Sequence, residues 1–272
     1  MLTETFHSIA VAARNVFRNW QSLLLTALVY ASLLAALYFF VAVREASIGQ
    51  VVLTFVLAIA APLLFFVLQA MIASEVEQLT VGSLVKKSLT GFWKLLLISL
   101  PLIALAVLIA YLLGKAQAHF GATLNNPATE LARPRNLSGQ SAARPIDWKA
   151  ALLSTIRYLA LGLALPLAAI HLWLATAREG LGMAVKKVGS HLARAFAPQS
   201  VLIYIAGFLI FGVVPYFLLF RSIPTKHAWL ELVLLVARLA IIFALTLIGW
   251  IITVRALSFF PVRASSDQGE AA

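Results

Sequence analysis

The chain has 272 residues, 62% of them apolar and 11% charged, with a formal net charge of +11 and no cysteine. Soluble domains are about 45–50% apolar and about 25% charged, so this composition excludes a soluble fold of similar size. The lack of cysteine excludes disulfides, thiolate metal sites and a cysteine nucleophile. Because the basic residues lie at the ends of apolar stretches, their charge suits anionic lipid headgroups and does not predict a nucleic-acid partner.

Stretches without charged residues predict six membrane-spanning helices. A helix needs roughly 20 apolar residues to cross a bilayer core about 30 Å thick, and lipid offers the backbone no hydrogen-bond partners, so each span should be helical. The predicted spans are residues 20–43, 50–73, 95–114, 155–177, 200–220 and 232–257. The first stretch is too long for the core of a signal peptide, so we expect it to remain in the protein. The predicted fold is an all-α, polytopic membrane helical bundle, with residues 1–263 as a single transmembrane domain.

The short loops predict that both termini lie in the cytoplasm. In that orientation the inner loops are rich in lysine and arginine, whereas the two short outer loops carry only Arg44, Arg221 and Lys226, in agreement with the positive-inside rule. Residues 115–150, rich in Asn, Pro, Ser, Gly and Arg, are expected to form a long, irregular extracytoplasmic loop. The polar tail, residues 264–272, is expected to be disordered.

Amphipathic stretches precede the first, third and fifth predicted spans, and two of them contain the same sequence, VKK, at residues 85–87 and 185–187. Placed on a helix, each stretch has an apolar face opposite a basic face, which is typical of helices that lie in the membrane interface. A basic residue near an anionic membrane surface contributes about 1 kcal/mol to binding. The candidate contacts for anionic headgroups on the cytoplasmic side are Lys86, Lys87, Lys186, Lys187 and Arg194.

The similarity between the two VKK regions extends toward the N-terminus of each. Residues 51–75 align with residues 155–179 without a gap, which matches Pro62 with Pro166, and a short gap then brings the VKK sequences into register. Both regions start on the outer side in the predicted topology, so the relation is that of a parallel internal repeat. The predicted repeat units are residues 51–114 and 155–220.

Two segments, "GSLVKKSLTGFWKLLLISL" and "GLGMAVKKVGSHLARAF", place a small residue before a basic amphipathic helix that leads into a span. This layout, over residues 50–220, resembles that of a group of poorly characterised six-span bacterial membrane proteins. The group includes the membrane domain attached to some glycerophosphoryl diester phosphodiesterases. The resemblance implies a multi-pass protein of the bacterial cytoplasmic (inner) membrane. The chain has no phosphodiesterase catalytic domain, so the resemblance implies no catalytic activity.

Two polar residues within predicted spans, His171 and Arg238, are candidates for an intramembrane polar site. His171 is either a proton-sensitive or ligand-binding group in the bundle, or a histidine hydrogen-bonded to a neighbouring helix. Arg238 is either a substrate-binding cation, or its guanidinium reaches the outer surface or pairs with Glu231. For both residues the second alternative, in which the side chain has a structural role and binds no ligand, is the more common one in membrane proteins.

Nothing in the sequence predicts catalysis, a cofactor or a metal ion. No pair of acidic residues lies inside a span, and the chain has no HExxH, P-loop, G-x-S-x-G or dinucleotide-binding motif. The sequence therefore predicts a non-catalytic integral membrane protein, a module that interacts with membrane lipids or with a membrane-protein partner. The alternative is a small permease, or the membrane subunit of a transporter, for a hydrophobic or lipidic substrate. The scarcity of polar groups inside the spans favours the first interpretation, although the path of a hydrophobic substrate needs few such groups.

Overall fold

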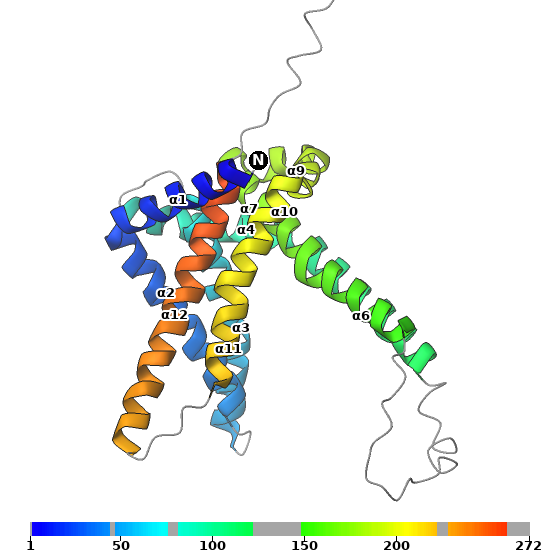
Figure 1. Ribbon diagram of the computed structural model, residues 1–272. Coiled ribbons are helices and arrows are strands. Elements are labelled where there is room, and N and C mark those ends of the chain that lie inside the picture. Colours follow the sequence, from blue (N-terminus) through cyan, green and yellow to red (C-terminus); the bar gives the residue numbers. More distant parts are fainter. Residues whose placement is uncertain (1, 44–46, 76–80, 122–147, 222–227, 260–272) are drawn as a thin grey trace, which may run out of the picture. The chain divides into compact units, whose positions relative to one another are not determined.

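The computed structural model describes residues 2–43, 47–75, 81–121, 148–221 and 228–259 (Figure 1). Within these residues all regular structure is helical. The helical segments that are long and apolar enough to cross a membrane are Trp20–Ala42, Ile48–Ser74, Val81–His119, Ala151–Glu179, Pro198–Phe220 and Trp229–Ser258. The prediction of an all-α, polytopic membrane protein with six spans is therefore confirmed.

Most of the surface of these helices is apolar and exposed. In five of the six spans, less than a fifth of the most apolar stretch is buried inside the protein. Large side chains such as Leu28, Phe55, Val107 and Phe217 are more than 60% exposed. Water-soluble monomers rarely expose contiguous apolar patches larger than a few hundred Å², so lipid is the solvent that these helices require.

The chain divides into two compact units, the first formed by Met1–Ile98 with Ile170–Ala272 and the second by Ser99–Ala169. The second unit contains parts of α4 (Val81–Gly121) and α7 (Leu165–Glu179), together with α6 (Trp148–Leu159) and the π-helical turn η1 (Ala160–Ala164). Pro166 follows η1 closely. Because proline has no N–H to donate, a local π-helical turn helps to satisfy the backbone carbonyls that it leaves without a donor.

In the first unit, α12 packs against more helical elements than any other helix does. It packs against α1, α3, α10, α11 and the π-helical turn η2, while α2 packs against α3. The bounds of these elements are α1 Leu2–Arg18, α2 Trp20–Ala42, α3 Ile48–Glu75, α10 Pro198–Phe208, η2 Leu209–Val213, α11 Val214–Phe220 and α12 Ala228–Ser258. Glycines allow the close approach to α12: a Cβ added to Gly207 would lie 2.3 Å from Thr253 Oγ1, and one on Gly249 would lie 2.0 Å from Phe211 Cγ. Small residues at such contacts are usual between membrane helices.

Side-chain hydrogen bonds also connect α12 to its neighbours. Trp250 Nε1 donates to Gln69 Oε1 of α3 over 3.0 Å, and the hydroxyl oxygens of Tyr30 in α2 and Thr246 lie 3.0 Å apart. Bonds of this kind contribute about 0.6–2 kcal/mol each inside a membrane. They stabilise the position of α12 against both α2 and α3.

The buried core of the first unit is concentrated at one end of its helices. There, residues 68–74 of α3 and 251–258 of α12 are buried without interruption. α1 lies across this end at a steep angle to α2 and α12 (Figure 1), and its residues Ala12 and Val16 are fully buried. Asn19, which has non-helical backbone angles (φ −110°, ψ 64°), separates α1 from α2.

The three predicted interfacial stretches take different forms. α1 is a separate helix, and the second VKK segment (residues 180–198) contains two short helices, α8 (Leu181–Lys186) and α9 (Val188–Ala195). The first VKK segment (residues 81–98) instead forms the start of α4, which continues for 41 residues. At 1.5 Å per residue α4 is about 60 Å long, roughly twice the thickness of the bilayer core, so a large part of it lies outside the hydrocarbon. The location of all three stretches in the membrane interface remains a prediction.

The ends of the predicted long loop are helical. α4 continues to Gly121 and α6 begins at Trp148, which differs from the irregular structure that we predicted from residue 115 to residue 150. The sequence "KAQAHFG" that follows the third span contains good helix formers, so the helix continues beyond the apolar residues. Residues 122–147 of the predicted loop and the predicted tail, 264–272, lie outside the described residues.

Candidate functional site

A small polar pocket lies at the end of the first unit where the buried core is concentrated. The end of α3, the start of α4 and the end of α7 form it. Its volume is about 80 Å³, and because a water molecule occupies about 30 Å³ in the liquid, the pocket suits a group of a few heavy atoms. It is lined by Ala70, Ser74, Lys87, Thr90, Gly91, Lys94, Leu95, Thr176 and Ala177. We call it the Lys87–Lys94 pocket.

The two lysines of this pocket lie on one face of α4. Seven residues separate Lys87 from Lys94, which is close to two full turns of a helix with 3.6 residues per turn. Lys87 is half-buried and Lys94 is exposed. A lysine ammonium is a compact charge with three donors on a flexible stem, so both groups can reach an anion at the mouth of the pocket.

Thr176 contributes a buried hydroxyl from α7. The residue is 2% exposed, and its Oγ1 makes no hydrogen bond with any described residue. A buried donor without a partner costs about 1–3 kcal/mol, which makes Thr176 a candidate ligand-binding residue. Thr90 differs, because its Oγ1 donates to the backbone carbonyls of Lys86 and Lys87, with oxygen–oxygen distances of 2.9 and 3.1 Å.

Aromatic packing holds the three helices of the pocket together. Phe66, Ala70 and Leu95 form a buried cluster against which Phe92, Leu96 and Trp173 pack. The ring of Trp173 meets that of Phe66 edge-on, with a centroid distance of 6.5 Å. Because Ala70 and Leu95 themselves line the pocket and Trp173 lies about one turn before Thr176 on α7, this cluster positions the lysines and Thr176 relative to one another.

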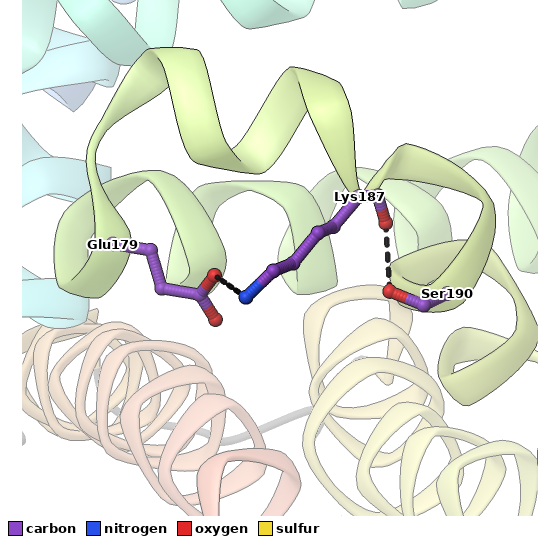
Figure 2. Close-up of polar contacts among 3 residues, drawn as sticks. All are labelled: Glu179, Lys187 and Ser190. Atoms are coloured by element: carbon purple, nitrogen blue, oxygen red, sulfur yellow. Dashed lines mark hydrogen bonds and ion pairs between the residues drawn. The ribbon is translucent and has the colours of Figure 1, made fainter.

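Lys187 lies between α8 and α9, where it forms an ion pair with Glu179. Its Nζ lies 3.2 Å from Glu179 Oε2, and its carbonyl accepts a hydrogen bond of 2.8 Å from Ser190 Oγ (Figure 2). Gly180, at φ +84°, reverses the chain direction after α7, and α8 then returns Lys187 to Glu179. Only glycine adopts this backbone conformation readily.

Of the five predicted headgroup contacts, only Lys87 lies in the pocket. Lys86 and Lys186 are exposed elsewhere, and Arg194 is half-buried on α9. The sequence prediction missed Lys94 and Thr176. The seven-residue spacing of Lys87 and Lys94 on one helix was a usable signal, whereas no sequence signal placed Thr176 beside them.

His171 and His191 form a second polar group, on α7 and α9. They are 9% and 3% exposed, and the Nε2 atom of each is buried without a hydrogen-bond partner among the described residues. Burial lowers the pKa of His191, Glu179 opposes this effect, and Arg194 and Lys187 reinforce it. His191 is therefore neutral at pH 7. One of the two interpretations of His171 was a hydrogen bond to a neighbouring helix, and its Nε2 forms no such bond with any described residue.

Arg238 of α12 contacts the C-terminal end of α11. Its Nη1 donates to the backbone carbonyl of Arg221, the residue that follows the last turn of α11. The last carbonyls of a helix have no partner within the helix, so Arg238 caps α11. It also lines a groove of about 310 Å³ between α11 and α12, together with Glu231 and Leu218.

No group of three or more histidine or acidic side chains converges to hold a metal ion within the part of the chain that the structure describes. Comparison with known proteins gives no relative: no protein-family model, no curated protein and no solved structure matches this chain. The resemblance to six-span bacterial membrane proteins therefore stays a prediction from the sequence.

Proposed function

We propose that this chain is a non-catalytic integral membrane protein of the bacterial inner membrane, which binds the headgroups of anionic lipids on its cytoplasmic side. The observation that carries this proposal is the Lys87–Lys94 pocket, in which two lysines and a buried hydroxyl adjoin exposed apolar helices. Further basic side chains, Lys86, Lys186 and Arg194, lie on neighbouring turns of α4, α8 and α9.

Charge supports this proposal energetically. Each basic residue close to an anionic leaflet contributes about 1 kcal/mol, and salt weakens this attraction because the Debye length is about 10 Å at 0.1 M. Several lysines at one end of the helices therefore favour anionic over zwitterionic lipid. Their position at the ends of apolar spans is also the arrangement that the positive-inside rule associates with the cytoplasmic face.

The test is retention of anionic lipid by the purified protein in native mass spectrometry. Changing Lys86, Lys87, Lys186 and Lys187 to Gln should reduce the retention of phosphatidylglycerol, and added salt should reduce the difference from the unchanged protein. The matched control also removes four charges by changing Lys115, Lys149, Arg157 and Arg221 to Gln, since these basic residues lie near the other ends of the spans. Equal losses in both variants would show that the location of the charge is irrelevant, and no loss in either would contradict the proposal.

The orientation on which the proposal depends is tested by cysteine labelling of this cysteine-free chain. Ala193 in α9 and Ala118 in α4 are both exposed, and each is changed to Cys in a separate variant. In intact cells we expect a membrane-impermeant thiol reagent to label the residue at position 118 and to spare the one at position 193. The reverse pattern would place the basic end of the helices outside the cell.

A small permease for a hydrophobic or lipidic substrate is the second candidate. The groove between α11 and α12 favours it, because a volume of about 310 Å³ with mostly apolar lining and two charged residues is of the size that small amphipathic ligands occupy. Proteoliposomes should then move a fluorescent lipid analogue between leaflets faster than protein-free vesicles. Binding without such movement would leave the non-catalytic lipid-binding module as the function.

A further inference from the structure

We propose that the Lys87–Lys94 pocket binds the phosphate group of one anionic glycerophospholipid, whose acyl chains lie along the exposed apolar side of α4. This inference rests on the proposed function and deepens it, because it assigns a single lipid to a single built site. The proposed function by itself needs only a general attraction between lysines and an anionic membrane surface, which requires no defined binding site.

The phosphate group matches the pocket in charge and hydrogen bonding. A lipid phosphodiester carries one negative charge and two unesterified oxygens that accept hydrogen bonds, and Lys87, Lys94 and Thr176 are all donors. The Thr176 hydroxyl is buried and unpartnered, so a bound phosphate would supply the acceptor that the described structure does not. A volume of about 80 Å³ admits a phosphate group but not an acyl chain.

An apolar stripe on α4 adjoins the lysine face and fits the rest of the lipid. Leu89, Trp93 and Leu97 follow one another at intervals of four residues and are 53%, 55% and 52% exposed. Side chains four apart lie above one another on a helix, and tryptophan is enriched where membrane helices meet the headgroup region. A ligand that satisfies both faces has an anionic head and apolar chains, which favours a phospholipid over free phosphate.

The other lysines lack these features. Lys86, Lys186 and Lys187 do not line the Lys87–Lys94 pocket. Lys87 and Lys94 thus differ from these lysines in lining a pocket to which the buried Thr176 also contributes.

The experiment titrates phosphatidylglycerol onto the delipidated full chain in detergent and follows the first bound lipid by native mass spectrometry. Hydrogen bonds to charged groups contribute enough that Thr176→Val should weaken binding about tenfold. Lys94→Gln should weaken it about fivefold. The controls are Lys115→Gln, an exposed lysine toward the other end of α4, and Thr155→Val, whose hydroxyl donates to the Ala151 carbonyl at 2.9 Å. Both controls should stay within about twofold of the unchanged protein, because neither removes a proposed phosphate contact.

Thermal unfolding separates a loss of binding from a loss of folding. Without lipid, Thr176→Val should unfold at the same or a higher temperature than the unchanged protein, because valine removes an unpaired buried hydroxyl. With phosphatidylglycerol, the unchanged protein should gain more in melting temperature than the variant. Gly91→Leu is a second variant that keeps every charge. Gly91 lies between Lys87, Lys94 and Leu95 on the α4 face, and an added Cβ meets no atom within 4 Å, so leucine should fill the pocket and prevent binding.

Three outcomes would overturn this inference. If Thr176→Val, Lys94→Gln and Gly91→Leu bind phosphatidylglycerol as well as the controls do, while the four-lysine variant still loses retention, the proposed function survives and the pocket assignment fails. If inorganic phosphate or glycerol phosphate raises the melting temperature as much as the lipid does at equal concentration, the ligand is a soluble phosphate. If neither the pocket variants nor the four-lysine variant changes lipid binding, both proposals fail.

Discussion

The two VKK segments have similar sequences but different structures. In the first VKK segment the helix runs through Lys87 into the span without a break, so that Lys87 and Lys94 share one face and line a pocket. In the second, the backbone leaves the helix at Lys187 and again at Ala197, and Lys187 forms an ion pair with Glu179. The same local sequence therefore places Lys87 within a continuous helix, where it lines a pocket, and Lys187 at a break between two short helices.

Two residues that occur only in the second VKK segment explain part of this difference. Pro198 begins α10, and Ala197 before it has extended backbone angles (φ −59°, ψ 139°), because a residue that precedes proline is disfavoured in the helical region. Aligning the VKK sequences places Ile98 at the position of Pro198, and the helix continues there. Gly180 allows the sharp reversal that precedes α8. Helix continuity, more than local charge, decides what each lysine contacts.

The largest expected effect is that of a proline introduced into the first VKK segment. Leu97 is 52% exposed in α4, so Leu97→Pro removes a backbone donor without emptying a core position, and should cost about 3 kcal/mol or more in unfolding free energy. It should also disturb the common face of Lys87 and Lys94. Unfolding in mixed detergent, followed by circular dichroism, measures the change. Leu97→Ala is the control, and equal stability of the two variants would show that α4 does not need to be continuous.

A smaller loss is expected when the reversal in the second VKK segment is hindered. Gly180 has φ +84° and ψ 162°, a region that residues with a side chain enter only at a cost of about 1–3 kcal/mol. Gly180→Ala should lower the free energy of unfolding by that amount in the same assay. Gly182→Ala is the control, because a Cβ there meets no atom within 4 Å and alanine favours a helix by about 1 kcal/mol. If Gly180→Ala behaves like this control, the positive φ is not required.

The smallest expected effect concerns the ion pair between Glu179 and Lys187. These side chains are 34% and 50% exposed, and such surface pairs contribute about 0–1 kcal/mol, so Glu179→Gln should lower stability by less than about 1 kcal/mol. The same change frees Lys187 and should raise retention of phosphatidylglycerol slightly. A double-mutant cycle with Lys187→Gln isolates the pair. A coupling energy well above 1 kcal/mol would show that the pair determines the structure of this segment.

The candidate site was predictable only in part. Lys87 was identified from the repeated VKK sequence, and Lys94 follows it by seven residues on the same helix. Thr176 was not identified, because its importance depends on burial beside α4 and on the lack of a hydrogen-bond partner. His171 was recognised as an intramembrane polar residue, but its proximity to His191 depends on how α9 folds back. Arg238 was expected at the outer surface or near Glu231, and its contact with the Arg221 carbonyl required the position of α11.

The sequence by itself determined that lipid surrounds most of this protein, and it determined the number of membrane spans. A run of about 20 residues without charge must avoid water and satisfy its own backbone hydrogen bonds, and both requirements hold whatever the neighbouring helices do. The tertiary structure alone decided which polar groups meet. Lys87 and Lys94 come from α4, Ser74 from α3 and Thr176 from α7, and their meeting depends on the packing of Phe66, Leu95 and Trp173. Packing between segments far apart in the chain has no periodicity that a single sequence displays.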